Sequence, residues 1–132
     1  MWRSGVVRRR SDAALSEMIE NAVRWNSFDS PWHSTPQVWQ HFRDEGEILC
    51  QLQRQWRTAL AGAVYVAIEA GDGDLRADVT RAFEKVERKH FGLRKILEAH
   101  ADHPAIAHAM RKEQSLLAGL VGLSTGGTPQ AA

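Results

Sequence analysis

The chain has 132 residues, of which 43% are hydrophobic and 25% charged, and its formal net charge is +1 at pH 7. These values are typical of one globular domain and exclude an intrinsically disordered chain. No apolar run reaches the roughly 18 residues that a membrane-spanning helix needs, and a single cysteine excludes an internal disulfide. We therefore expect a cytoplasmic protein with no membrane contact.

Positive charge gathers at the start of the chain, where arginine occupies positions 3, 8, 9 and 10 and no acidic residue occurs. We expect residues 1–11 to form a flexible basic arm, because a short polar terminus has little to pack against. We do not expect nucleic acid as a partner, except through Arg8, Arg9 and Arg10. Phosphate binding needs clustered cations, and the rest of the chain carries more acidic than basic residues.

The first predicted helix covers about residues 12–26. Ser11 or Asp12 can cap its N-terminus, and apolar residues recur along it at the spacing of one helical face. A loop follows this helix, because Pro31 and Pro36 bias the residues before them away from helical backbone angles. Pro36 is also typical of the first residue of a new helix.

Three further helices follow. No proline or turn motif interrupts residues 36–70, so the sequence predicts one long helix there. A turn at 71–74, rich in Gly and Asp, leads into a third helix over about 75–101, and Pro104 begins a fourth that ends near residue 122. The tail, residues 124–132, is rich in Gly, Thr and Ala and is expected to be disordered.

The second and third predicted helices carry matching apolar seams, in which steps of three and four residues alternate. The first seam runs Val38, Phe42, Glu45, Leu49, Leu52, Trp56, Ala59, Ala63, Val66 and Ala70, and the second runs Leu75, Val79, Ala82, Val86, Lys89, Leu93, Ile96 and His100. An antiparallel hairpin sets Ala63 opposite Ala82 and Leu49 opposite Ile96. The sequence therefore predicts an all-α fold, an antiparallel four-helix bundle over residues 12–123 built on this long hairpin.

Five of the six histidines fall at the hairpin end opposite the glycine turn, and Glu45 takes a seam position where the pattern calls for an apolar residue. Spacing places His41 and Glu45 on one helical face, with His100 and His103 opposite them. Imidazole and carboxylate are ligands that zinc, iron and manganese accept. One hypothesis is therefore a Zn, Fe or Mn site formed by His41, Glu45, His100 and His103, with His33 or Asp102 as a further ligand.

Two other interpretations of the same residues stay open. If the bundle simply ends there, Glu45 pairs with His100 as a salt bridge and His103 caps the last helix ahead of Pro104. The histidines can also form a pH-responsive cluster, because the ordinary imidazole pKa is about 6.5.

No catalytic residue is assigned, because no nucleophile or acid–base pair is placed by the pattern, and Cys50 is expected to be a buried, inert thiol. Apolar residues off the seam leave a further face to bury. They favour a non-enzymatic helical interaction or assembly module, homo-oligomeric or bound to a protein partner. The alternative is a metal- or small-ligand-binding bundle, sensor or enzyme, that uses the histidine-rich end.

Overall fold

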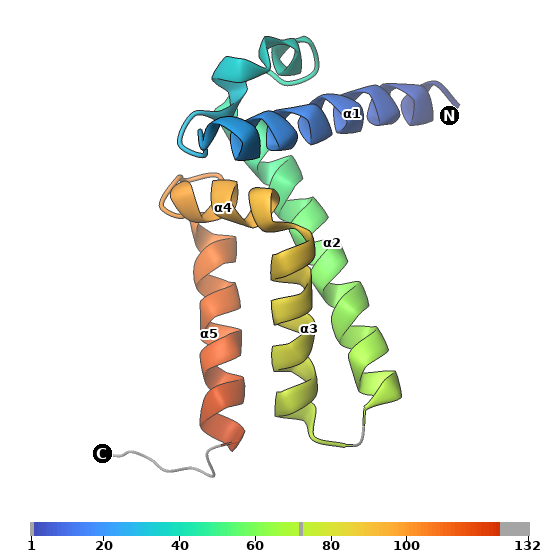
Figure 1. The fold of residues 1–132 in the computed structure, drawn as a ribbon, viewed down its shortest axis with the longest axis vertical. Helices are drawn as coiled ribbons and strands as arrows, with labels where there is room; N and C mark the ends of the chain where they lie inside the picture. Colours follow the sequence, from blue (N-terminus) through green and yellow to red (C-terminus); the bar gives the residue numbers. More distant parts are fainter. Residues whose placement is uncertain (1, 72, 125–132) are drawn as a thin grey trace.

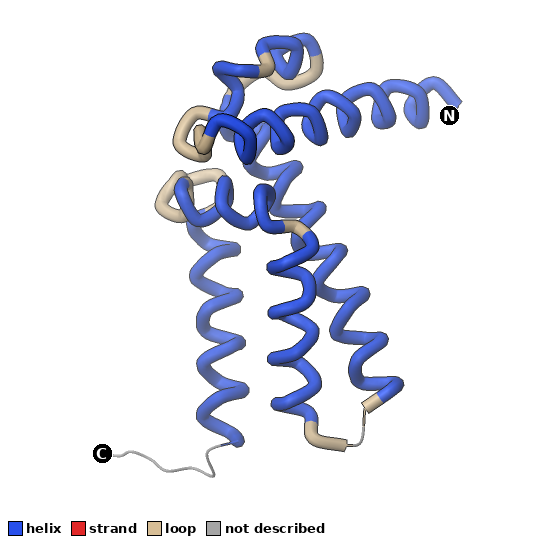
Figure 2. The backbone as a smooth tube through the Cα atoms, in the orientation of Figure 1, coloured by secondary structure: helices blue, strands red, loops and turns tan. Residues whose placement is uncertain are grey.

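The structure, a computed structural model, describes residues 2–71 and 73–124, with side chains for 8–71 and 73–119. Regular structure within these residues is entirely helical, which confirms the predicted all-α class (Figure 2). The elements are α1 (Trp2–Trp25), the 3₁₀ helices η1 (Pro31–Ser34) and η2 (Pro36–Gln40), α2 (Glu45–Ala70), α3 (Leu75–Lys89), α4 (Phe91–Ala99) and α5 (Ala107–Ser124).

The arrangement differs from a simple bundle. Helices α2 and α3 pack closely as an antiparallel hairpin and α5 runs alongside α3, while α1 and the short α4 cross the upper end of these three (Figure 1). A four-helix antiparallel bundle is therefore not confirmed. The reason lies in α1, whose buried face packs on η1, η2 and α4 at one end of the molecule rather than along α2 and α3.

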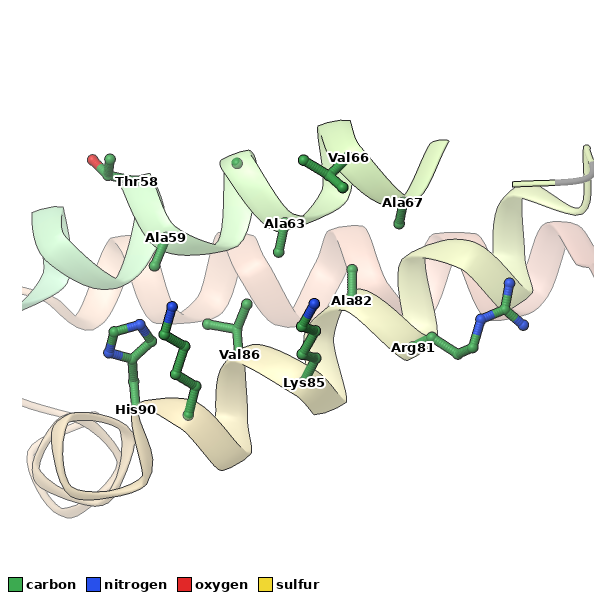
Figure 3. Close-up of a pocket in the computed structure, with 12 residues that line it drawn as sticks. Thr58, Ala59, Ala63, Val66, Ala67, Arg81, Ala82, Lys85, Val86 and His90 are labelled. Atoms are coloured by element: carbon green, nitrogen blue, oxygen red, sulfur yellow. The ribbon is translucent and has the colours of Figure 1, made fainter. Parts of the chain in front are cut away.

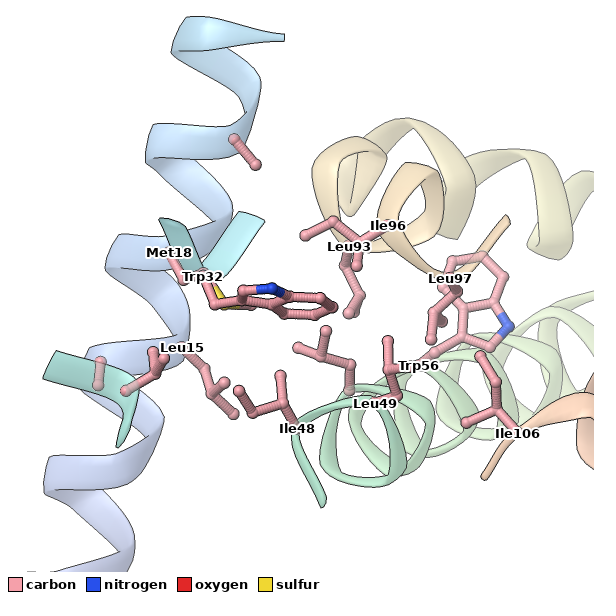
Figure 4. Packing of buried hydrophobic residues seen from close by; sticks show 14 of the residues in the cluster. Leu15, Met18, Trp32, Ile48, Leu49, Trp56, Leu93, Ile96, Leu97 and Ile106 are labelled. Carbon is pink, nitrogen blue, oxygen red and sulfur yellow. The ribbon is translucent and has the colours of Figure 1, made fainter. Parts of the chain in front are cut away.

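The hydrophobic core lies at this upper end, where α1, η1, the first half of α2, α4 and the start of α5 converge (Figure 4). Leu49 and Ile96, which the sequence pattern placed opposite each other, are both fully buried in it. Along α2 the last buried residue is Trp56. The far half of the α2–α3 hairpin therefore extends beyond the core, with fewer helices around it.

The long helix predicted over residues 36–70 is interrupted, because residues 41–44 are not helical. Asp44 is the N-cap of α2, where its Oδ1 accepts a hydrogen bond from the Glu47 backbone N–H (2.9 Å). The Glu47 carboxylate in turn accepts from the Arg43 backbone N–H (2.8 Å). The Asp-x-x-Glu spacing at positions 44–47 resembles a capping box, a signal in the sequence that the prediction of one unbroken helix missed.

The third predicted helix is also divided, at His90, whose backbone angles (φ −116°, ψ 45°) lie outside the helical region. The change in direction carries α4 beneath α1 and buries Leu93 and Ile96 in the core. Gly92 makes the close approach possible, because a Cβ there would lie 2.6 Å from Val23 Cγ2. Tertiary packing against α1, not a local helix breaker, accounts for the division.

The N-terminal end of the chain also differs from the prediction. Helix α1 begins at Trp2, so most of the residues expected to form a flexible arm belong to this helix. The Ser11 hydroxyl donates to the Arg8 carbonyl within α1 and does not cap its start. The last predicted helix is α5, and the tail expected to be disordered lies outside the described residues after Ser124. No described helix combines the length and apolar character needed to cross a membrane.

Candidate interaction surface

The four residues of the hypothesised metal site do not gather at one point. Glu45 is exposed at the start of α2 and lines a shallow hollow with His103, whereas His41 lines a separate hollow with Cys50. His33 and Asp102, the further candidate ligands, are exposed. Within the described part of the chain, no three His, Cys, Asp or Glu side chains are grouped to hold a metal ion. Metal binding stays a prediction from the sequence pattern.

His100 faces the loop after α1 rather than Glu45. Its ring packs on Trp32 with 5.2 Å between ring centroids, and its Nε2 lies 3.3 Å from the Phe28 carbonyl oxygen. The ion pair expected between Glu45 and His100 is accordingly not among the salt bridges of the described residues.

His103 and Cys50 both contact the backbone of Ala105, in the chain segment that precedes α5. The His103 Nδ1 accepts a hydrogen bond from the Ala105 backbone N–H (3.0 Å), two residues before α5 begins at Ala107, so this bond orders the turn ahead of α5 rather than capping the helix as predicted. Cys50 is exposed, with its Sγ 3.6 Å from the Ala105 carbonyl oxygen, so the prediction of a buried thiol was wrong. The helical position beside the seam turns Cys50 toward solvent.

One charged cluster is buried, and the seam pattern did not indicate it. Arg94 Nη1 lies 2.8 Å from Glu113 Oε1, and these side chains are 9% and 12% exposed. The Trp56 indole N–H donates to Glu113 Oε2 (2.7 Å), and the Arg94 guanidinium lies 4.7 Å from the centroid of the Trp56 ring. The Trp56 indole N–H and Glu113 Oε2 satisfy each other, whereas Arg94 Nη1 and Glu113 Oε1 lie at ion-pair distance without hydrogen-bond geometry. The cluster connects α2, α4 and α5, so we assign it to holding these helices together. Only the four-residue spacing of Arg94 and Glu98, which also pair (3.2 Å), was visible in the sequence.

The far half of α2 is apolar on all sides. Eleven consecutive residues, Thr58 to Ile68, carry no charge, and none of them is buried. A helix that is apolar around its whole circumference is normally surrounded by other elements. Helix α3 packs more extensively on α2 than any other element does, and Figure 1 shows it beside this half of α2. Part of its surface is therefore free to contact something else.

Two distinct surfaces result, of which the first is the outer face of α2, formed by Ala61, Tyr65 and Ile68. Steps of four and three residues place these side chains on one side of the helix. Tyr65 is 67% exposed and Ile68 47% exposed. Leu75, at the start of α3, is also exposed and extends the apolar surface at the hairpin end. This exposure of large apolar side chains is typical of an interaction surface rather than of a solvated helix.

The second surface is a groove of about 530 Å³ between α2 and α3, which we call the hairpin groove (Figure 3). It is lined by Thr58, Ala59, Gly62, Ala63, Val66 and Ala67 from α2, and by Arg81, Ala82, Lys85, Val86, Lys89 and His90 from α3. Residues that the seam pattern placed opposite each other, such as Ala63 and Ala82, line it together. The predicted register therefore agrees with this half of the hairpin.

The two sides of the hairpin groove differ in charge. The α2 side carries no charge, whereas the α3 side carries three cations and no acid. Arg81 is paired with the buried carboxylate of Asp78, but neither Lys85 nor Lys89 has an ion-pair partner within the described residues. Partial burial and then the neighbouring Lys89 lower the pKa of His90 below 6.5. The groove thus presents two lysine ammonium groups and an imidazole whose pKa is lowered.

Comparison with known proteins adds no assignment: no protein-family model, curated protein or solved structure matches this chain.

Proposed function

We propose that the protein is a non-enzymatic helical assembly module that forms a homodimer through the outer face of α2. The observation that supports this proposal is the uncharged stretch Thr58–Ile68, which leaves Tyr65 and Ile68 about half to two-thirds exposed. Complete burial of such a side chain contributes about 1.5–3 kcal/mol. A two-fold symmetric contact buries each of these residues twice, once from each copy.

A second copy is the proposed occupant because the charges along α2 complement each other in an antiparallel pair. Arg54 and Arg57 precede the uncharged stretch, and Glu69 follows it. When two copies of α2 pack antiparallel, the basic end of one lies beside Glu69 and the negative helix terminus of the other. A parallel pair would instead place like charges together. Two α2–α3 hairpins joined in this way form a four-helix bundle between chains rather than within one.

The test is the mass in solution, measured by light scattering after gel filtration over a range of protein concentrations. The wild-type protein is expected to reach the dimer mass, and Ile68→Lys is expected to remain a monomer. Leu116→Lys is the matched control, because Leu116 on α5 is 62% exposed but lies outside the proposed contact. Far-ultraviolet circular dichroism establishes that each variant is folded.

Charge reversal provides a second, independent test of the dimer. Glu69→Arg is expected to weaken the dimer, and adding Arg54→Glu and Arg57→Glu to the same chain is expected to restore it. A wild-type protein that stays monomeric at the highest concentration, or a dimer that Ile68→Lys leaves intact, would refute the proposal.

A further inference from the structure

The floor of the hairpin groove has the shape of a helix-docking surface. Its α2 side is formed largely by the small residues Ala59, Gly62, Ala63 and Ala67. A Cβ added at Gly62 would meet no atom within 4 Å, so the surface is open at its centre. Small side chains let the backbone of another helix approach closely. The stretch from residue 58 to 67 extends over about 15 Å, or nearly three helical turns.

The rim of the groove, formed by Lys85 and Lys89 on α3, favours an occupant with negative charge. Lys85 and Lys89 are four residues apart, so their attachment points lie about 6 Å apart along α3. Figure 3 shows the Lys85 side chain rising from α3 toward α2 at the edge of the groove. Arg81 adds little net charge, because it is paired with Asp78, whose side chain is 3% exposed. An occupant with carboxylates at four-residue spacing would meet both lysines without a like-charge contact.

A second copy of this chain does not supply that pattern. A copy docked in the groove through its own α2 would offer no acidic residue between Glu47 and Glu69. A single-stranded nucleic acid would find cations, but the groove lining contains no Phe, Tyr or Trp on which bases could stack. An amphipathic helix with glutamates beside an apolar stripe matches both the floor and the rim.

We therefore propose that the hairpin groove docks an acidic amphipathic helix of a partner protein. The partner's small and medium apolar residues lie on the alanine-rich floor. Its glutamates, at positions i and i+4, pair with Lys85 and Lys89. This surface is separate from the outer face of α2, so docking and self-association are independent properties.

The experiment uses two fluorescently labelled helical peptides of about 18 residues, a length at which isolated helices begin to be stable. Both have the same Leu and Ala stripe, flanked by glutamates in one peptide and by lysines at the same positions in the other. Fluorescence anisotropy is measured with the full-length protein and, to remove self-association, with Ile68→Lys. The protein is expected to bind the glutamate peptide at least about tenfold more tightly than the lysine peptide, a difference of about 1.4 kcal/mol.

Charge reversal at the rim tests whether the groove is responsible. Lys85→Glu with Lys89→Glu is expected to weaken binding of the glutamate peptide about tenfold or more and to strengthen binding of the lysine peptide. Arg111→Glu with Lys112→Glu is the matched control, since it makes the same charge change at two exposed positions of α5 and should leave binding unchanged. The proposal would be overturned if the two peptides bind with equal affinity, or if reversing Lys85 and Lys89 leaves the affinity unchanged. Equally strong competition by a single-stranded oligonucleotide would also overturn it.

Discussion

Replacing Gly92 with alanine is expected to destabilise the protein, although alanine is the better helix former. Gly92 lies near the start of α4, directly beneath α1. An added Cβ would stand 2.6 Å from Val23 Cγ2 and 2.8 Å from Ile19 Cγ2, well inside the 3.5–4.0 Å of a normal carbon contact. Both obstructing atoms belong to β-branched side chains, which have little rotamer freedom within a helix. The two helices must therefore move apart.

The expected size follows from two opposing terms. Overpacking of this kind costs about 1–3 kcal/mol. Replacing glycine by alanine inside a helix returns at most about 1 kcal/mol. Because the added Cβ meets two atoms below 3.0 Å, the overpacking cost lies in the upper part of its range, about 2–3 kcal/mol. The net effect of Gly92→Ala is therefore a loss of about 1–2 kcal/mol in the free energy of unfolding, or about 4–8 °C in Tm for a chain of this size.

Gly62→Ala is the matched control, because the same change is made in a helix where an added Cβ meets nothing within 4 Å. It should stabilise the protein by about 0.5–1 kcal/mol. Both variants are compared with the wild type by urea unfolding followed by circular dichroism at 222 nm, at one low protein concentration. A Gly92→Ala variant as stable as the wild type would show that α1 and α4 do not pack as described.

Three further outcomes are expected. Glu113→Ala should lower the free energy of unfolding by about 3 kcal/mol, because it leaves Arg94 buried without its main partner. Arg94→Met with Glu113→Leu should recover most of this loss, and urea unfolding followed by tryptophan fluorescence measures both variants. A loss below about 1 kcal/mol in Glu113→Ala would contradict the assignment. Asp44→Ala should lower the free energy of unfolding by about 1 kcal/mol through loss of the α2 cap. Asp44→Asn should keep most of the stability that the cap contributes, and thermal unfolding measures both variants. Because partial burial, with the adjacent lysine, lowers the pKa of His90 below 6.5, the unfolded chain takes up the proton first. The contribution of His90 to stability is thus present above pH 6.5 and lost as the pH falls through its folded value, and a pH–stability curve unchanged by His90→Gln would refute this.

The three- and four-residue spacing of apolar residues predicted the buried side of the hairpin well. Leu49, Leu52 and Trp56 on α2, and Val86 and Ile96 on the facing segments, are all buried. The pattern succeeds because the helical repeat is local, so sequence spacing alone decides which residues share a face. It also placed the pairs that line the hairpin groove, although it did not indicate that this part of the hairpin is left open.

The candidate metal site shows where such reasoning stops. Spacing correctly predicts that residues four apart share a face, but it assumes that both helices continue unbroken to the histidine-rich end. The Asp44 cap and the turn at His90 end that continuity. His100 is consequently carried to Trp32, while Glu45 stays at the exposed start of α2. Once a helix changes direction, the pairing of positions between the two helices can no longer be extended to predict which side chains are in contact.

The all-helical class, the antiparallel hairpin and its apolar face follow from the order of residues, because each depends on interactions within a few positions along the chain. The directions of α1 and α4, the buried Arg94–Glu113 pair and the open faces of α2 depend on contacts between segments far apart in sequence. Such contacts are selected by how whole surfaces pack, as at Gly92, where the absence of one methyl group lets two helices cross. The surfaces proposed for assembly and for docking exist because the core gathers at one end and leaves the other half of the hairpin partly uncovered.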